Sequence, residues 1–357
     1  MTLRYRMQKT VLSLFLVAAV FLPVSLWAQQ KKVAVTNMTT PFGPPMYTQG
    51  VAFEEVFKKA KSWVEWKAQE TPGAMYIVKY VFKNQKKIET GQVPQVVSPS
   101  SGGVLPFLIE GRKPFTKINI PNNRALFSMP SYSMVFVTFD PNIKSLKDLA
   151  GKKVGIAEKS RPFQGVLAIG PYFMKGLKNW KKVKWQFLGA ANSKDALLNN
   201  KIDAHYATFM GSVDQAKDGS FSTRKLAPGP ALLELMNSGR KLYFIPWEPE
   251  VIKKSYDFSK DMLSYPILVK KGAVEGLDRE IYFRLSVGTI AGDVSMPDNV
   301  LQEIIRVRHE YRKELGKYHA TLKLLPDNPY PAGIPDKWVH PGVKKAMRNL
   351  NIPIPGE

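Results

Sequence analysis

A polar loop at residues 157–165, between a predicted strand and a predicted helix, is the strongest candidate for ligand chemistry. It contains Ser160, Arg161 and Gln164. A guanidinium can hold a carboxylate through two parallel hydrogen bonds, and the start of a helix favours an anion at the same place. Ser160 and Gln164 would add hydrogen bonds to that ligand. We therefore predict that Arg161 binds a carboxylate; the alternative is an arginine exposed on a loop.

Further polar and aromatic residues fall where ligands bind in an open α/β sheet, at the carboxyl ends of strands. Ser100 and Ser101 follow one expected strand, and Thr208 follows another. The two serines would serve equally well as ordinary turn residues. Tyr132 and Phe163 are candidates for the wall of a ligand site, with a place in the core as the alternative.

The residue patterns of common enzymes are missing from the sequence. It has no cysteine, no G-x-S-x-G, no H-E-x-x-H and no phosphate-binding Walker loop. His309 and His319 are ten residues apart, which does not suit a metal site. His205 ends an expected strand close to a ligand site, but a structural role is the interpretation we favour. We predict a binding protein, not an enzyme, without metal or cofactor.

The N-terminus is typical of a cleavable signal peptide at residues 1–28. Basic residues at the start precede an apolar run at 11–22, and Ala28 offers a cleavage point. The run is shorter than the roughly 20 apolar residues that span a membrane, although an N-terminal anchor is the alternative. Because there is no cysteine to carry a lipid, we predict a free periplasmic protein.

The chain is strongly basic. Its formal net charge is +23, or +20 without Arg4, Arg6 and Lys9. Such a charge suits nucleic acid, anionic surfaces or anionic ligands. The lysines occur as scattered pairs, which usually indicates solvated faces, so we predict a small anionic solute as partner and no nucleic acid.

Strands and helices alternate along the chain, which predicts an α/β fold with parallel strands. About 330 residues remain after export, which exceeds one comfortable core and suggests two lobes. Strands are expected at 31–36, 95–97, 132–139, 151–156, 183–188, 204–207 and 286–291, and helices at 53–64, 74–85, 166–173, 194–199, 297–316 and 340–350.

Four phrases carry a family resemblance. Residues 143–156 (IKSLKDLAGKKVGI) resemble the stretch that opens the second lobe of type II periplasmic binding proteins. Residues 196–204 resemble their A-L-x-x-G-x-I-D-A stretch, with Asn200 in place of glycine. GAVEGLD at 272–278 and HPGVKKAMRNLN at 340–351 resemble elements of TAXI-type receptors of TRAP transporters.

The first ligand loop departs from the TAXI pattern. That family has a glycine-rich T-G-G-T-G-G-x-Y-Y-P here, whereas residues 36–48 read TNMTTPFGPPMYT. Proline removes the backbone donors that a glycine-rich turn offers to an anion. We therefore expect side chains of Thr39, Thr40 and Tyr47 to take over, with a ligand that differs from those known for the family.

The resemblance implies a two-lobed type II periplasmic binding protein, a Venus-flytrap with two open, mostly parallel sheets flanked by helices. Lobe 1 would comprise 29–136 plus 285–357, and lobe 2 would comprise 137–284. A monomer would close on a small organic anion, such as a carboxylate, and deliver it to a TRAP-type membrane permease. Alternatives are a substrate-binding protein of an ABC transporter for a taurine-, nitrate- or phosphonate-like solute, and a sensory receptor of the same fold.

Overall fold

The computed structural model describes residues 31–40, 45–159, 161–216, 218–223, 225–257, 264–277 and 279–357. The signal peptide expected at 1–28 and the candidate Ser160 lie outside these residues. Within them the strands are β1 (Val33–Thr39), β2 (Val64–Glu70), β3 (Gln95–Ser101), β4 (Asn123–Thr138), β5 (Lys153–Ile156), β6 (Lys184–Phe187), β7 (Ala204–Gly211), β8 (Asp214–Gln215), β9 (Phe221–Thr223), β10 (Leu226–Pro228), β11 (Tyr243–Ile245), β12 (Tyr265–Val269) and β13 (Ile281–Asp293).

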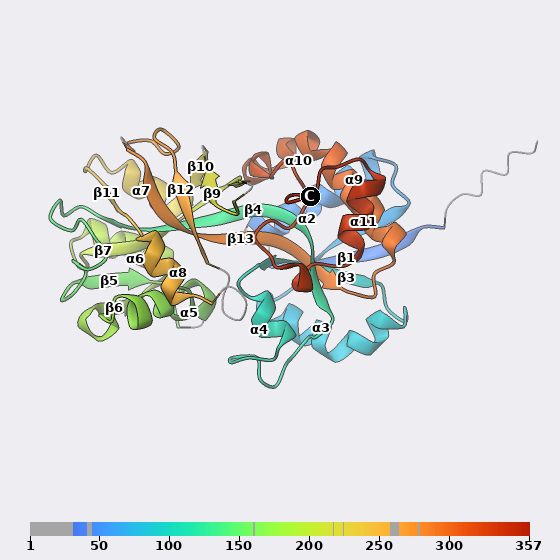
Figure 1. The fold of residues 1–357 in the computed structure, drawn as a ribbon, viewed down its shortest axis with the longest axis horizontal. Coiled ribbons are helices and arrows are strands. Elements are labelled where there is room, and N and C mark those ends of the chain that lie inside the picture. The colour runs from blue at the N-terminus through green and yellow to red at the C-terminus, as the bar shows by residue number, and fades with distance from the viewer. Residues whose placement is uncertain are drawn as a thin grey trace, which may run out of the picture. The chain divides into compact units, whose positions relative to one another are not determined.

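Helices connect most of the strands and cover both faces of the sheet (Figure 1). They are α2 (Pro45–Lys59), α3 (Ala74–Glu89), α4 (Leu105–Ile109), α5 (Val166–Pro171), α6 (Gly189–Leu198), α7 (Pro230–Met236), α8 (Pro249–Ser255), α9 (Asp298–Glu310), α10 (Arg312–Tyr318) and α11 (Gly342–Asn349). None of the helices in the described ranges is long and apolar enough to cross a membrane.

Two long strands, β4 and β13, run through the whole sheet (Figure 1). The hydrogen-bonded order is β2-β1-β3-β13-β4-β7-β5-β6. Around β1 the strands β2 and β3 pair in parallel, and β3 lies antiparallel to β13. Around β7 the strands β5 and β6 continue in parallel, and β7 lies antiparallel to β4. We call the part around β1–β3 the first lobe and the part around β5–β7 the second lobe.

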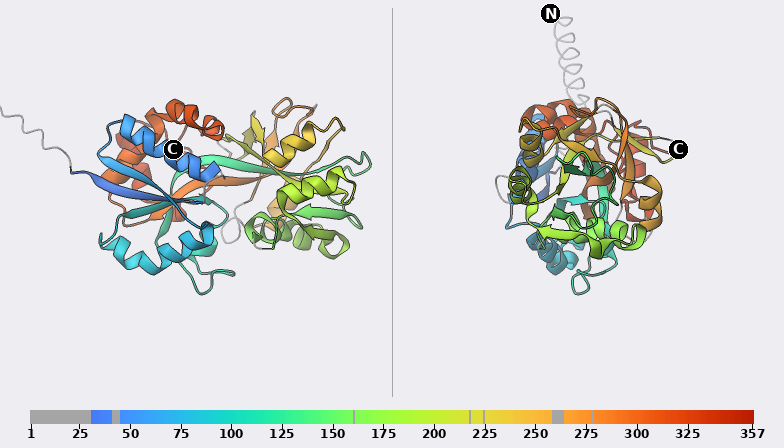
Figure 2. Two further views of the ribbon diagram at one scale, coloured as in Figure 1. Left: turned by 180° about the vertical axis from the view of Figure 1, so that it is seen from behind. Right: turned by 90° about the vertical axis from the view of Figure 1, so that its left-hand side faces the viewer.

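The predicted α/β class and the two-lobed fold are confirmed, with one difference in the sheets. We expected two separate sheets, and β4 and β13 instead join them into one hydrogen-bonded ladder, visible from behind in Figure 2. The sequence predicted only the segments 132–139 and 286–291 of these strands. The boundaries of the lobes, 29–136 plus 285–357 and 137–284, remain a prediction.

The first half of β4 was not predicted from the sequence, because it contains Pro130 and proline usually interrupts a central strand. The structure accommodates it with a register shift opposite, between Ser286 and Gly288 of β13. A Cβ atom on Gly288 would lie 2.3 Å from the carbonyl oxygen of Pro130. Glycine is therefore required there, because only a residue without a side chain allows the two backbones to approach so closely.

Two other sequence predictions need correction. Val64 was expected to continue a helix, but α2 ends at Lys59 and Val64 begins β2. Lys61 lies between them with a φ of 50°, a left-handed conformation that ends a helix. The long helix expected at 297–316 is two helices, α9 and α10, which meet at Tyr311.

The hydrophobic core follows the joined sheet. Its larger cluster extends through both lobes and includes Phe53, Phe209 and Leu232. A second cluster lies in the second lobe, where Phe136 of β4 contacts Trp247 and other aromatic residues. Because the larger cluster crosses the lobes, the two do not have fully separate cores.

Candidate functional site

The shared strands place two predicted site residues on one face of the sheet. Tyr132 of β4 is opposite Met210 of β7, and Met134 is opposite Thr208. Residues two apart on a strand, and residues directly opposite across an antiparallel pair, share a face. Tyr132 and Thr208 are therefore near neighbours at the centre of the molecule, where the lobes meet.

Among the residues that the structure describes, the hydroxyl groups of Tyr132 and Thr208 have no hydrogen-bond partner. Both residues are half-buried, and neither side chain donates or accepts a hydrogen bond within the described part of the chain. Burial raises the pKa of the Tyr132 phenol, so this group is a neutral donor at physiological pH. Half-buried hydroxyls without partners are suited to hydrogen bonding with a bound solute.

Arg284 of β13 lies on the same face, opposite Met134, and the sequence analysis missed it. Its guanidinium is fully buried; Nη2 donates to Ser264 Oγ at 2.7 Å and Nη1 to the Tyr206 hydroxyl at 3.1 Å. The signal in the sequence was an arginine inside an apolar strand, because a buried charge must be compensated by hydrogen bonds or by opposite charge. Arg284 places a positive charge next to Tyr206 in this face.

Phe163 links the second lobe to the first. Its ring stacks on Phe115, with centroids 5.5 Å apart and planes 7° apart, and meets Phe107 edge-on at 5.3 Å. Phe107 belongs to α4 of the first lobe, whereas Phe163 follows β5 of the second. We call Phe107, Phe115 and Phe163 the aromatic clasp. Phe107 and Phe163 pack with Tyr132 against one core cluster, so the clasp adjoins the Tyr132 face.

Arg161 lies on the same loop but points into solvent. Its side chain is 66% exposed, and its Nε lies 3.8 Å from Glu158 Oε2. Gln164 is also exposed. In this conformation neither residue is buried beside Tyr132, so binding through Arg161 remains a prediction.

The loops of the first lobe contribute less than the sequence suggested. Thr39 is buried, and its hydroxyl donates to the carbonyl of Gln69, tying β1 to β2. The buried Thr40 Oγ1 makes no hydrogen bond to any residue that the structure describes. Tyr47 is half-buried on α2, and Ser100 pairs with Thr289 in the sheet. Ser101 pairs with Gly288 through its backbone.

His205 has the structural environment that we favoured from the sequence. His205 is 2% exposed and lies on β7, the strand that also carries Thr208. The two residues are three positions apart, and side chains alternate along a strand, so His205 points to the opposite face of the sheet. Burial lowers the pKa of its imidazole to about 4. The ring is therefore neutral at physiological pH and does not contact the Tyr132 face.

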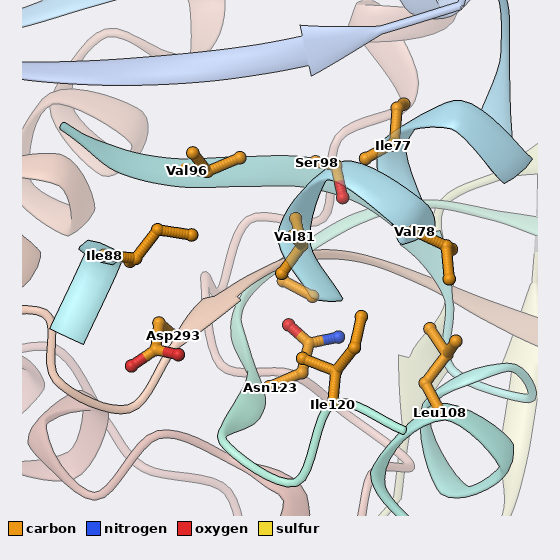
Figure 3. A pocket seen from close by; sticks show the side chains of 11 residues that line it. Ile77, Val78, Val81, Ile88, Val96, Ser98, Leu108, Ile120, Asn123 and Asp293 are labelled. Carbon is orange, nitrogen blue, oxygen red and sulfur yellow. The ribbon is translucent and has the colours of Figure 1, made fainter. Parts of the chain in front are cut away.

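A small cavity lies elsewhere, under α3 in the first lobe (Figure 3). Val81 and Ile88 line it on one side, and Asn123 and Asp293 line it from the ends of β4 and β13. Asp293 is 4% exposed, and its Oδ2 makes no hydrogen bond within the described ranges. The volume of about 30 Å³ holds one or two water molecules and no organic solute.

No group of three or more His, Asp or Glu side chains suited to a metal ion occurs in the part of the chain that the structure describes. The groups near Tyr132 are hydroxyls, aromatic rings and the buried guanidinium of Arg284, which is hydrogen-bonded to Ser264 and Tyr206. This set can bind a polar or anionic molecule through hydrogen bonds and ring contacts.

Comparison with known proteins gives a partial family match. The model of the NMT1/THI5-like family matches residues 124–227, which include β4, β5 and β7. A comparison with curated protein sequences gives no match.

Several solved structures are similar over most of their length. A TctC solute-binding protein from Polaromonas has 11% identity, with 89% of this chain and 98% of that chain covered and a TM-score of 0.49. A periplasmic sulfonate-binding protein, SsuA, from Methylobacillus flagellatus has 13% identity, coverage of 90% and 96%, and a TM-score of 0.46. The second substrate-binding domain of GlnP from Lactococcus lactis has 15% identity, coverage of 83% and 96%, and a TM-score of 0.42.

Proposed function

We propose that this chain is an extracytoplasmic solute-binding protein that closes its two lobes on a small organic anion. The observation that carries the proposal is the pair of unbonded, half-buried hydroxyls of Tyr132 and Thr208 beside the aromatic clasp. They lie where strands shared by both lobes meet loops from each lobe. A solute held there would contact both lobes and favour the closed form.

The anionic class of solute is supported by charge. The guanidinium of Arg284 lies on the face that carries Tyr132 and Thr208, and the chain has a formal net charge of +23. Arg161 lies on the loop that carries Phe163 and would add a second cation if its exposed side chain turned toward the bound solute. The uncharged phenol of Tyr132 would donate a hydrogen bond to a carboxylate or sulfonate oxygen.

The proposal is tested by binding and by two conservative substitutions. Purified protein is screened by thermal shift against carboxylates, amino acids, sulfonates and neutral sugars. Tyr132→Phe and Thr208→Val should each weaken the best ligand by about 0.5–1.5 kcal/mol per lost hydrogen bond, more if the ligand oxygen is charged. Tyr76→Phe is the matched control, because Tyr76 is 45% exposed on α3.

Two outcomes would contradict the proposal. A response to neutral sugars alone would remove the anionic class. A ligand whose affinity is unaffected by both Tyr132→Phe and Thr208→Val would remove this face as the site.

The delivery step is proposed from the sequence motifs. The TAXI-like phrases at 272–278 and 340–351 favour a TRAP-type permease as the membrane partner. Co-purification from detergent-solubilised membranes should recover the small and large membrane subunits of a TRAP-type permease. Recovery of an ATPase would instead indicate an ABC transporter, and recovery of a histidine kinase without a permease would indicate a sensor.

A further inference from the structure

The positive charge of this protein is concentrated in two segments that contain almost no acidic residues. Residues 159–194 contain no aspartate or glutamate, and residues 71–139 contain only Glu89 and Glu110. Among the residues that the structure describes, ten exposed lysines of these segments have ammonium groups without an ion pair or a hydrogen bond: Lys79, Lys83, Lys86, Lys87, Lys113, Lys117, Lys178, Lys181, Lys182 and Lys184. Some lysines elsewhere, such as Lys58 and Lys345, form ion pairs with neighbouring carboxylates.

Four of these lysines form a stripe along α3. With 100° per residue, Lys79, Lys83, Lys86 and Lys87 lie roughly opposite Ile77 on the helix. Ile77 and Ile88 are the buried residues of α3, so the stripe faces solvent. The helix thus buries one side in the first lobe and presents a row of ammonium groups on the other.

The loop that carries Lys113 and Lys117 packs against the same helix. Phe115 and Ile120 of the loop lie in one cluster with Val78 and Val81 of α3. Gln85 Nε2 of α3 also donates to the carbonyl of Asn119 at 3.2 Å. The loop therefore enlarges the positive surface of the first lobe.

The second group of lysines lies in the second lobe, on the same side of β4 and β13 as α3. Lys178, Lys181 and Lys182 precede β6, and Lys184 is the first residue of this strand. Figures 1 and 2 show α3, α5 and β6 all below the shared strands. The stack of Phe115 on Phe163 joins the loop of the first group to the loop that leads into the second. We call these ten lysines the basic face.

We propose that the basic face docks the protein on an anionic phospholipid surface. Juxtaposed lysines are attracted to membranes that contain acidic lipids, without a need for shape complementarity. A protein partner is less well matched, because lysine is depleted in protein interfaces and a specific interface needs apolar or aromatic anchors at its centre. The stripe on α3 consists of ammonium groups, and the exposed Met75 and Tyr76 lie beside it only in the first turn of the helix. Docking would hold a solute-loaded protein close to membrane proteins.

Co-sedimentation with lipid vesicles tests the proposal with the unit Val33–Glu357, which is compact by itself and lacks the apolar N-terminal run. Vesicles of phosphatidylcholine with phosphatidylglycerol should bind it at low salt, and vesicles of phosphatidylcholine alone should not. Raising the salt concentration should abolish binding, because these charges are exposed.

Two variants locate the surface. Substitution of the α3 lysines (K79Q, K83Q, K86Q, K87Q) should weaken binding at least tenfold, since one lysine near an anionic membrane contributes about a fivefold change in affinity. The same substitution at Lys178, Lys181, Lys182 and Lys184 should act similarly. The matched control (K61Q, K271Q, K313Q, K323Q) removes four exposed, unpaired lysines outside the basic face and should have a much smaller effect.

Three results would overturn the proposal. One is the absence of binding to anionic vesicles. Another is equal loss of binding in the control and the basic-face variants, which would reduce the effect to net charge. The third is that the protein binds only native membranes and that protease treatment of those membranes abolishes the binding. This result would indicate an acidic protein partner. Thermal unfolding of each variant establishes that it is folded.

Discussion

Truncation of Phe163 to alanine is the most direct test of lobe closure. Phe163 makes two ring contacts with the first lobe, stacked on Phe115 and edge-on to Phe107. Each aromatic pair contributes about 0.5–1.5 kcal/mol beyond the area that it buries, so the closed form should lose about 1–3 kcal/mol relative to an open form that lacks these contacts. A change of this size corresponds to roughly a 5- to 150-fold weaker apparent affinity for a solute that requires closure.

The assay has two readouts. Small-angle X-ray scattering of the solute-free variant should give a larger radius of gyration than the wild type, and calorimetric titration with the solute from the thermal-shift screen should give a higher Kd. Phe139→Ala is the control, because Phe139 is half-buried in the second lobe, where Arg240 stacks on it at 3.8 Å. It should lower stability and leave the affinity unchanged. If Phe163→Ala behaved in both readouts like Phe139→Ala, the clasp would be packing within a rigid body and the reasoning would be wrong.

Two further predictions concern stability. Gly288→Ala should lower the free energy of unfolding, measured by urea titration, by about 2–4 kcal/mol, because the added Cβ would lie 2.3 Å from the Pro130 carbonyl oxygen. Gly170→Ala is the control, because its Cβ would lie 3.6 Å from the nearest atom. Equal effects of the two substitutions would contradict the steric argument. His205 stays neutral in the folded protein down to a pKa of about 4, whereas an unfolded histidine binds a proton near pH 6.5. The unfolded state therefore binds more protons in this window, and acidification from pH 6.5 to 4 should remove roughly 3 kcal/mol of stability. His205→Gln should flatten that pH profile, and the lowered pKa of His340 leaves a residual slope in the same direction. A profile that is identical in His205→Gln and the wild type would exclude His205 as the cause.

The parts of the fold with strong local patterns were predictable. The stretch 204–207 and the apolar spacing of 74–85 gave β7 and most of α3, because burial of one helix or strand face leaves a regular pattern in the sequence. β2 was missed because Val64 continues the helical spacing of α2, and only the left-handed backbone at Lys61 separates them. β4 was half missed because the effect of Pro130 is compensated by Gly288, more than a hundred residues later in the chain.

The candidate site was predictable only in part, for a similar reason. Loops at the carboxyl ends of strands can be located from the order of elements, which indicated Phe163 and Thr208, whereas Tyr132 was proposed as an aromatic residue at the start of an expected strand. Which of their side chains share a face depends on strand register, and the pairing of Met134 with both Thr208 and Arg284 is a long-range property. Arg284 was missed because an arginine in an apolar strand does not by itself indicate a binding site. Its position in the site depends on the residues that pair with it across the sheet. The lysine pairs seemed scattered for the same reason, since α3 and the turn before β6 are distant in sequence.

The continuity of β4 and β13 limits how the two lobes can move. Loops that connect separate bodies allow a swing through a wide angle, whereas hydrogen-bonded strands resist it and respond by twisting. In the proposed closure, the paired ladder would therefore have to twist, and the elastic energy stored in it would favour reopening once the solute leaves. We expect the twist to concentrate at the register shift between Ser286 and Gly288, because the regular succession of backbone hydrogen bonds is already interrupted there.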